Sequence, residues 1–522
     1  MKRRNFFKTA VLGGGTLALA PLSSCVQPTS SIASGPDYAD FELNELTISQ
    51  LQEQMSSGKL TSEEITRKYL DRIELVNING PELRAVIEIN PEAIKIAQEL
   101  DVERMVGKLR GPLHGIPVLI KDNIDTGDQM QTTAGSLALV GSPAPDDAII
   151  VQKLRKAGAV LLGKTNLSEW ANFRSTKSSS GWSGRGGQVR NPFCLDRSPC
   201  GSSSGTGAAV SANLCAIGIG TETDGSIVCP SGINGIVGIK PTVGLWSSDG
   251  IIPISHSQDT AGPMARTVSD AAVLLGLLAE NVQDYTQSLD VNGLKNARFG
   301  IASDYFGFNT EVDKLMADAI QILKDVGAII VENLKFEKRE EWGSAEWQVL
   351  ISEFKADMNA YLKTRTGLKV QTLADLIEFN KNNAETELKW FGQEIFETAE
   401  KTTGLEDPVY LEALKNSKKL TREEGIDKLM DEHKLDALIA PTNGPAWTID
   451  WVNGDHFGGG SSDVAAISGY PNITVPVGYV HGLPVGISFF GRAWSEPTLI
   501  KLAFAFEQAT KHRKAPGFLN EK

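Results

Sequence analysis

The chain has 522 residues, of which 41% are hydrophobic, so it is long and apolar enough to bury a large core. Its formal net charge is −13 at pH 7, which disfavours a broad nucleic-acid-binding surface. We therefore expect no nucleic-acid partner.

The first residues have the pattern of an export signal. A basic run, Lys2-Arg3-Arg4-Asn5-Phe6-Phe7-Lys8, precedes an apolar segment that is too short to span a bilayer. The adjacent arginines are typical of twin-arginine export signals. The segment ends at Leu22-Ser23-Ser24-Cys25, which resembles a lipoprotein box. The alternative is an ordinary secretory signal cleaved near this point.

The lipoprotein interpretation divides the N-terminal region in two. It predicts a signal peptide over 1–25, with lipidation of Cys25, and a polar tether over 26–40. The expected location is the periplasm or cell envelope, with the lipid anchor as the one contact with a membrane. The remainder, 41–522, is predicted to form one large domain.

Four further cysteines, Cys194, Cys200, Cys215 and Cys229, lie around one central stretch. Export permits disulfides, but twin-arginine export carries folded proteins, so the fold should not depend on them. No C-x-x-C pair or ligand histidine accompanies these cysteines, which disfavours zinc. We expect buried free thiols and no metal site.

Patterns in the first half of the chain alternate between helix and strand. Thr61-Ser62-Glu63-Glu64 reads as a capping box that begins a helix. The apolar run that ends in Lys121 and Asp122 predicts a buried strand, and 159–162 predicts another. Thr165 or Asn166 is expected to cap a further helix. The Ser/Gly/Arg-rich segment 175–204 is long and irregular, which favours a site wall.

The same alternation continues through most of the second half. Helix and strand patterns follow one another from 205 to 331, and they return from 437 to a final helix over 497–510. Between them, 337–434 is charged, aromatic and mostly helical in pattern. The alternation predicts an α/β fold with helices on the faces of a sheet, and 337–434 is expected to be a peripheral helical elaboration.

The central stretch 201–230 concentrates serine and glycine in two short segments, Gly201-Ser202-Ser203-Ser204-Gly205 and Thr223-Asp224-Gly225-Ser226. A serine hydroxyl is a poor nucleophile until a base removes its proton. None of the six histidines has a neighbourhood that marks it as that base. The first segment fits the G-x-S-x-G elbow of α/β-hydrolases with Ser203 at its centre, but this match is weak in so serine-rich a segment.

Several blocks in order along the chain resemble the amidase signature family, and most closely its peptide amidase branch. The resemblance covers about 45–515. The blocks are Gly115-Ile116-Pro117-Val118-Leu119-Ile120-Lys121-Asp122, Gly163-Lys164-Thr165-Asn166-Leu167-Ser168-Glu169-Trp170, Gly201-Ser202-Ser203-Ser204-Gly205, Gly220-Thr221-Glu222-Thr223-Asp224-Gly225-Ser226-Ile227, Gly238-Ile239-Lys240-Pro241-Thr242, Asp259-Thr260-Ala261-Gly262-Pro263, Gly469-Tyr470-Pro471-Asn472-Ile473-Thr474-Val475-Pro476 and Gly482-Leu483-Pro484-Val485-Gly486.

The resemblance implies a Ser-cisSer-Lys triad. The nucleophile falls on Ser226, the proton-relaying serine on Ser202 after a cis peptide bond, and the base on Lys121. A lysine in a desolvated pocket can lose its proton near neutral pH, which fits this role. The implied mechanism needs no metal or organic cofactor.

The family's oxyanion hole falls on the backbone N–H groups of Thr223, Asp224 and Gly225, together with that of Ser226. Asp224 replaces the glycine common in the wider family, and Glu222 replaces an aspartate; both resemble the peptide amidase branch. Asp224 is expected either to contact a substrate amide or to form a structural salt bridge. Lys164 and Lys240 are expected to be structural.

The fold implied by the resemblance is a single large α/β domain with a mixed central β-sheet flanked by helices. The implied function is hydrolysis of a carboxamide to a carboxylate and ammonia through an acyl-enzyme, with C-terminal peptide amides as substrates. Alternatives are a fatty or aryl amide substrate, a transamidase subunit, and a non-enzymatic surface lipoprotein. The export signal argues against the transamidase.

Overall fold

The computed structural model describes residues 38 and 40–520 of the chain. The predicted signal peptide, the lipidation site at Cys25 and nearly all of the tether lie outside these residues.

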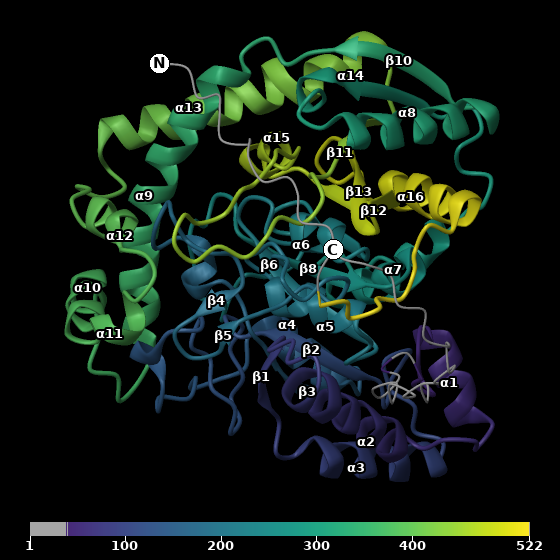
Figure 1. Ribbon diagram of the computed structural model, residues 1–522, viewed down its shortest axis with the longest axis vertical. Helices are drawn as coiled ribbons and strands as arrows, with labels where there is room; N and C mark the ends of the chain where they lie inside the picture. The colour runs from purple at the N-terminus through teal and green to yellow at the C-terminus, as the bar shows by residue number, and fades with distance from the viewer. Residues whose placement is uncertain (1–37, 39, 521–522) are drawn as a thin grey trace, which may run out of the picture. The chain divides into compact units, whose positions relative to one another are not determined.

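One mixed sheet of 11 strands runs through the described residues in the order β1-β3-β2-β6-β8-β7-β12-β13-β11-β9-β10 (Figure 1). Parallel pairs join β3, β2 and β6 in one half of the sheet and β11, β9 and β10 in the other, and antiparallel pairs join the strands between them. A separate two-stranded hairpin is formed by β4 (Trp182–Ser183) and β5 (Gly187–Gln188). The strands of the large sheet are β1 (Val86–Ile89), β2 (Pro117–Lys121), β3 (Val160–Thr165), β6 (Ile217–Glu222), β7 (Val237–Lys240), β8 (Thr260–Ala265), β9 (Arg298–Ala302), β10 (Ile329–Leu334), β11 (Ala437–Pro441), β12 (Asn472–Val480) and β13 (Leu483–Phe490).

The helices of the described residues cover this sheet and extend beyond it. They are α1 (Ile48–Ser56), α2 (Ser62–Ile73), α3 (Ala93–Met105), α4 (Ile149–Lys156), α5 (Ser204–Ser211), α6 (Val228–Ile233), α7 (Val268–Leu278), α8 (Thr310–Asp325), α9 (Arg339–Thr364), α10 (Leu373–Asn382), α11 (Ala384–Glu387), α12 (Glu394–Ala399), α13 (Pro408–Thr421), α14 (Asp427–His433), α15 (Asp463–Ser468) and α16 (Glu496–Thr510). The expected α/β fold with a mixed central sheet is therefore confirmed.

The central strands are buried along their whole length, which explains their continuous apolar sequence. All residues of β2 and β3 are buried, and α5 packs against both strands and against β6. The expected capping box at the start of α2 is present, because the Thr61 side chain and the Glu64 side chain each accept a backbone N–H of the other residue.

The sequence analysis missed three short strands of the large sheet, β1, β7 and β8, and the β4–β5 hairpin. Strand β8 contains glycine and proline, which are depleted in strands. Its low strand propensity therefore gave no strand prediction. The helix expected from Thr165 or Asn166 was wrong. Strand β3 continues to Thr165, and a single 3₁₀ turn follows at Glu169–Asn172, with Trp170 and Ala171 at positive φ.

The helical elaboration expected at 337–434 is present as α9 to α14 and forms the green helices to the left and top of the sheet in Figure 1. Phe354, Phe396 and other apolar side chains of this segment form one core cluster with Trp170 and Phe173 and with Ile252 and Ile254. The elaboration is thus packed on loops of the main sheet that surround the candidate site.

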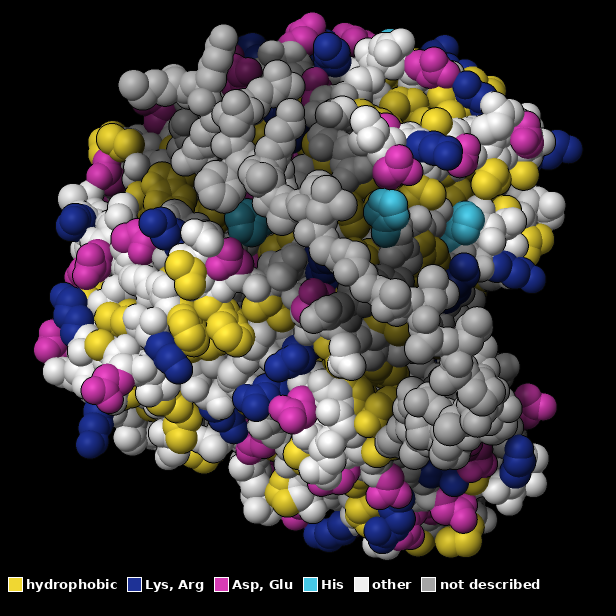
Figure 2. All heavy atoms as spheres, in the orientation of Figure 1, with side chains coloured by type: hydrophobic (Ala, Val, Ile, Leu, Met, Phe, Trp, Pro, Cys, Tyr) yellow, Lys and Arg dark blue, Asp and Glu magenta, His cyan; other side chains and the backbone are white. Residues whose placement is uncertain are grey.

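The surface of the described chain carries both signs of charge. In Figure 2, Lys/Arg and Asp/Glu side chains are interspersed over the visible face. Among the described residues, none of the helices combines the length and apolar character that crossing a membrane requires.

Candidate active site

Two adjacent parallel strands, β2 and β6, bring the candidate site residues together at their carboxyl ends. Ile120 of β2 lies beside Ile219 of β6, so the next residue of β2, Lys121, reaches Thr221 on β6. Open α/β sheets place ligands outside the carboxyl ends of their parallel strands, and this site follows that rule.

Lys121 is fully buried and makes three hydrogen bonds. Its Nζ donates to Ser202 Oγ at 2.8 Å, to Thr221 Oγ1 at 2.9 Å and to the Thr221 carbonyl at 3.3 Å. The lysine and the serine are 81 positions apart in the chain, and the fold brings them into direct contact.

Burial lowers the pKa of Lys121 from its ordinary 10.5 to about 7, since a charged ammonium loses hydration there. The carboxylates of Asp259 and Glu222 act in the opposite direction and limit the shift. A substantial fraction of Lys121 is therefore neutral near pH 7, which gives it the capacity to accept a proton.

Ser202 is fully buried and follows a cis peptide bond from Gly201, as the resemblance implied. Its carbonyl accepts the backbone N–H of Ser168 at 3.1 Å. A Cβ at Gly201 would lie 2.2 Å from Ser168 Oγ, so only glycine fits this close approach.

Ser226 lies on the loop after β6, on the other side of the same junction. Its carbonyl accepts the backbone N–H of Ser203 at 3.1 Å, which joins the two serine-rich segments. The side chain is 8% exposed, and its hydroxyl forms no hydrogen bond with any residue that the structure describes. Catalytic hydrogen bonds often tighten only when substrate is bound, so this geometry is compatible with a nucleophile.

The loop that precedes Ser226 is fastened by two carboxylates. Glu222 Oε2 accepts the backbone N–H groups of Ile227 at 2.7 Å and Val228 at 3.0 Å. Asp259 accepts the Thr223 hydroxyl at 2.5 Å, and its other oxygen accepts two backbone N–H groups of its own loop. These hydrogen bonds restrain the turn that contains the predicted oxyanion-hole residues, Thr223, Asp224 and Gly225.

Within residues 38 and 40–520, Asp224 lacks the salt bridge that was one of its two expected roles. Its Oδ1 atom is buried and has no hydrogen-bond partner within the described residues. Burial and the nearby carboxyl groups of Glu346 and Asp463 raise the pKa of Asp224 well above its ordinary value. Glu346 belongs to α9, so the helical elaboration delivers a carboxyl group to the candidate oxyanion loop.

Lys164 and Lys240 are buried but contact other groups. Lys164 Nζ donates to the Ile124 carbonyl at 2.6 Å and to Thr132 Oγ1 at 2.9 Å, and Lys240 Nζ donates to the Pro241 carbonyl at 3.1 Å. Burial lowers the pKa of each to about 8. Among the described residues, only Lys121 of these three lysines bonds to a serine of the candidate site.

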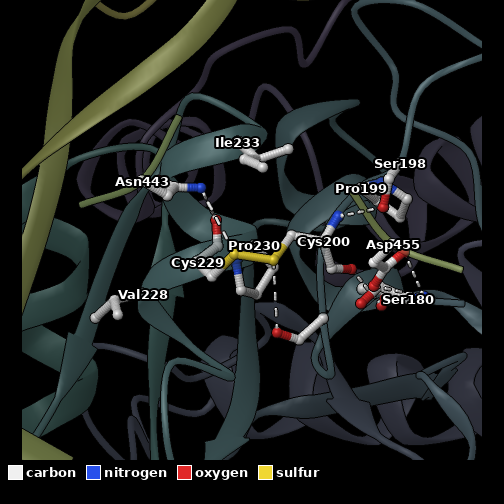
Figure 3. The surroundings of a disulfide bond; sticks show 12 residues. Ser180, Ser198, Pro199, Cys200, Val228, Cys229, Pro230, Ile233, Asn443 and Asp455 are labelled. Carbon is white, nitrogen blue, oxygen red and sulfur yellow. Dashed lines mark hydrogen bonds between the residues drawn. A yellow bond between two sulfur atoms is a disulfide. The ribbon is translucent and has the colours of Figure 1, made fainter. Parts of the chain in front are cut away.

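The expectation of four free thiols was wrong for two of the cysteines. Cys200 and Cys229 form a disulfide with a Cα–Cα distance of 6.1 Å (Figure 3). Cys194 and Cys215 are free and buried. The tertiary fold brings Cys200 and Cys229, which are 29 positions apart, within bridging distance, and this proximity has no signal in the sequence.

A cavity of about 100 Å³ adjoins the site. Its lining includes Thr221 and Thr223 together with apolar residues such as Ala171, Ile252 and Ile254. Because Thr221 also bonds Lys121, this cavity lies one residue from the candidate base.

His256, Glu353 and Asp357 lie at the edge of this region and bring their ligand atoms within 4.8 Å of one another. The Glu353 oxygens already accept the hydroxyls of Ser255, Ser257 and Tyr410. Asp357 is bonded to the ring and the backbone N–H of His256. This donor set is occupied by the protein's own groups, so the arrangement is a hydrogen-bonded network between the 255–257 loop and the helical elaboration.

Sequence reasoning missed Asn123 and Asp259 as members of this site and recognised Glu222 only as an unusual residue. Asn123 donates to Thr221 Oγ1 at 3.0 Å and so supports the hydroxyl that contacts Lys121. All three residues belong to or adjoin the family-like blocks. Their presence in those blocks was the available signal, but their partners are set by tertiary structure.

Comparison with known proteins identifies the family of the chain. The model of the Amidase family matches residues 64–500. The chain belongs to the amidase family. It is a hydrolase that acts on amide C–N bonds, so the non-enzymatic alternative is not supported.

Individual relatives and solved structures share nearly the whole length of the chain. A crystal structure of the peptide amidase PAM in complex with the inhibitor chymostatin is 51% identical, with a TM-score of 0.89, and covers 91% of this chain and 100% of that one. Native peptide amidase from Stenotrophomonas maltophilia is 50% identical, with a TM-score of 0.87 and coverage of 92% and 99%. An Arabidopsis thaliana protein named "probable amidase" is 44% identical over 92% of this chain and 93% of its own. The resemblance inferred from the sequence is thereby confirmed.

Proposed function

We propose that the protein hydrolyses C-terminal peptide amides to carboxylate and ammonia, with Ser226 as nucleophile, Ser202 as proton relay and Lys121 as base. The contact between Lys121 Nζ and Ser202 Oγ, at 2.8 Å in a fully buried environment, is the observation that carries this proposal. It joins a group that can be neutral near pH 7 to a hydroxyl beside the segment of Ser226.

In the first half of the reaction, neutral Lys121 accepts the Ser202 proton while Ser202 accepts the proton of Ser226. The Ser226 oxygen attacks the amide carbonyl, and the backbone N–H groups of Thr223, Asp224, Gly225 and Ser226 stabilise the resulting oxyanion. Glu222 and Asp259 support this step indirectly, because they hold the loop that carries these donors.

The same proton path then runs in reverse. Ser202 returns a proton to the amide nitrogen, which leaves as ammonia, and the acyl group remains on Ser226 as an ester. Water attacks this ester while Ser202 and Lys121 remove one of its protons, and the same path returns that proton to the departing Ser226 oxygen. The product acid is released as the carboxylate after it loses its proton to water. Every proton in the cycle is carried by these side chains and water, so the steps need no cofactor.

The substrate class is supported by the likeness to peptide amidases at 50% and 51% identity over nearly the full chain. The helical elaboration reaches the site through Glu346, which accepts the side-chain N–H of Gln258 at 2.9 Å, and Gln258 also donates to the Thr223 carbonyl at 3.4 Å. This segment is the candidate binding surface for the acyl part. A fatty or aryl amide is the alternative substrate.

Ammonia release by the purified protein tests the proposal directly. We expect release from C-terminally amidated peptides with a kcat/KM at least about tenfold above that for free amino-acid amides and for fatty amides. A tenfold ratio corresponds to roughly 1.4 kcal/mol of transition-state binding by the peptide part. The same peptides with a free C-terminal carboxylate are the matched control. Preference for a fatty or aryl amide would overturn the peptide assignment while leaving amide hydrolysis intact.

We propose in addition that the protein is exported and anchored through diacylglycerol on Cys25. The basic run, the apolar segment and the lipoprotein-box pattern at the N-terminus support this, all of them outside the described residues. Mass spectrometry of the mature protein from membranes should show Cys25 as a lipid-modified first residue. An unmodified chain that begins elsewhere would contradict it.

A further inference from the structure

We propose that the Cys200–Cys229 disulfide positions Ser202 against Ser226, so that the protein reaches full amide-hydrolysing activity only when these two cysteines are oxidised. This rests on the proposed function of the two serines.

The placement of the bond in the chain is the first observation. Cys200 is two residues before Ser202, and Cys229 is three residues after Ser226. The bond therefore closes the chain segment that contains both serines. Apart from the disulfide, the two serine segments are joined directly by one backbone hydrogen bond, from the Ser203 N–H to the Ser226 carbonyl.

The backbone at Cys200 is the second observation. Cys200 has φ 57°, in the left-handed region that residues with a side chain rarely adopt. Such a conformation persists only where the surroundings over-determine it. At Cys200 they do so through the disulfide and through a hydrogen bond from its N–H to Ser198 Oγ at 3.1 Å (Figure 3). In addition, the Cys200 carbonyl accepts the Ser204 hydroxyl at 2.6 Å. The direction in which the chain enters Gly201 and Ser202 depends on this residue.

The second cysteine of the bond, Cys229, is also held by its neighbours. Cys229 lies at the start of α6, and its carbonyl and sulfur both receive the Asn443 amide, at 3.4 Å and 3.5 Å. Both sulfurs belong to an apolar cluster with Phe193, Ile233 and Trp447. The disulfide is thus part of a packed apolar cluster, and its cysteines lie two residues before Ser202 and three residues after Ser226.

The lack of a hydrogen bond to the Ser226 hydroxyl explains why the disulfide matters for the position of this residue. Its hydroxyl forms no hydrogen bond within the described residues, so the separation of the two hydroxyls is set by the segments that carry them. Displacement of a reacting group by about 1 Å can cost roughly 10²-fold in rate. A covalent bond between the segments removes that freedom.

The Cα atoms of the bonded pair are 6.1 Å apart, within the usual range for a disulfide. One cysteine thiolate attacks an incoming protein or small-molecule disulfide and releases one of its thiols. The second cysteine then attacks the mixed disulfide and releases the other. Two thiols are oxidised and one incoming disulfide is reduced to two thiols. Such oxidants act in the compartments outside the cytosol, where disulfides persist.

The test compares the double variant Cys200→Ser/Cys229→Ser with the control Cys194→Ser/Cys215→Ser, which removes the two free thiols instead. For the first we expect kcat for ammonia release from a peptide amide to fall by about 10- to 100-fold, with KM within about twofold of wild type. The control should retain the wild-type kcat. In wild type, alkylation of the denatured protein followed by mass spectrometry should find two more reactive thiols after reduction than before it.

Reduction and reoxidation of the wild-type protein provide a second arm, which decides the matter if the double variant does not fold. Loss of kcat on reduction and its recovery on reoxidation, with the same KM, support the proposal. Unchanged kcat in a protein shown by mass to be reduced overturns it, as does an unchanged kcat in the folded double variant. Absence of ammonia release from oxidised wild type would instead overturn the proposed function, and this inference with it.

Discussion

Replacement of Ser226 by alanine is expected to lower kcat for ammonia release by roughly 10⁴-fold or more, the scale seen when a serine nucleophile is removed from a hydrolase. The hydroxyl is the atom that forms the acyl-enzyme, so no other group can take its place on this path. The fold should not change. The Ser226 hydroxyl bonds no described residue, so its removal leaves no buried partner unsatisfied. Activity is measured as ammonia release and stability by urea unfolding.

Ser203→Ala is the matched control, because Ser203 is the residue that a G-x-S-x-G search selects. Its hydroxyl donates to the Thr221 carbonyl at 3.0 Å and accepts the Thr221 N–H at 3.1 Å, which makes it a support of β6. We expect this variant to lose about 1–3 kcal/mol of stability and to retain measurable turnover. Loss of all turnover in Ser203→Ala, with an active Ser226→Ala, would reverse the assignment.

The sequence was most informative where local pattern and family resemblance coincide. The apolar run that ends at Lys121 predicts a buried strand. The family-like blocks that contain Ser202 and Ser226 predict that these two serines lie close to Lys121. The structure places Lys121 and Ser202 in contact at 2.8 Å. Strand periodicity alone could not have done this, because it gives a strand but not its neighbours in the sheet.

The features that sequence analysis missed depend on partners far away in the chain. Cys200 and Cys229 pair because α6 and the loop before α5 pack together, which no spacing rule reports. Asp224 lies among carboxyl groups because α9, more than 100 residues later, delivers Glu346. The turn at Glu169 replaced an expected helix because Glu169 is buried against Arg174, at 3.0 Å, and accepts the Gly184 N–H. In each case tertiary contacts override the local signal.

Replacement of Lys121 by methionine is expected to lower kcat by about 10²- to 10⁴-fold, the range of a general base. The pH profile carries the sharper signature. In wild type, kcat/KM should rise with pH through about 7, as Lys121 loses its proton, and this rise should be absent from the residual activity of the variant. Glu346→Gln is the matched control, since burial raises the pKa of Glu346 to about 7 as well. If the rise disappears in Glu346→Gln and persists in Lys121→Met, Lys121 is not the base.

Lys121→Met should also change stability in the opposite direction from activity. The folded-state pKa of Lys121, about 7, lies below its ordinary value of 10.5, so between these two pH values the unfolded chain binds a proton that the folded chain does not. The free energy of unfolding of wild type should therefore rise with pH across this window, by up to about 1.4 kcal/mol per pH unit from this group, and the burial penalty is full below pH 7. The methionine variant lacks that penalty, so it should be more stable than wild type at neutral pH, and the difference should shrink towards pH 10. Urea unfolding at several pH values measures both, and a stability difference that does not depend on pH would contradict the lowered pKa.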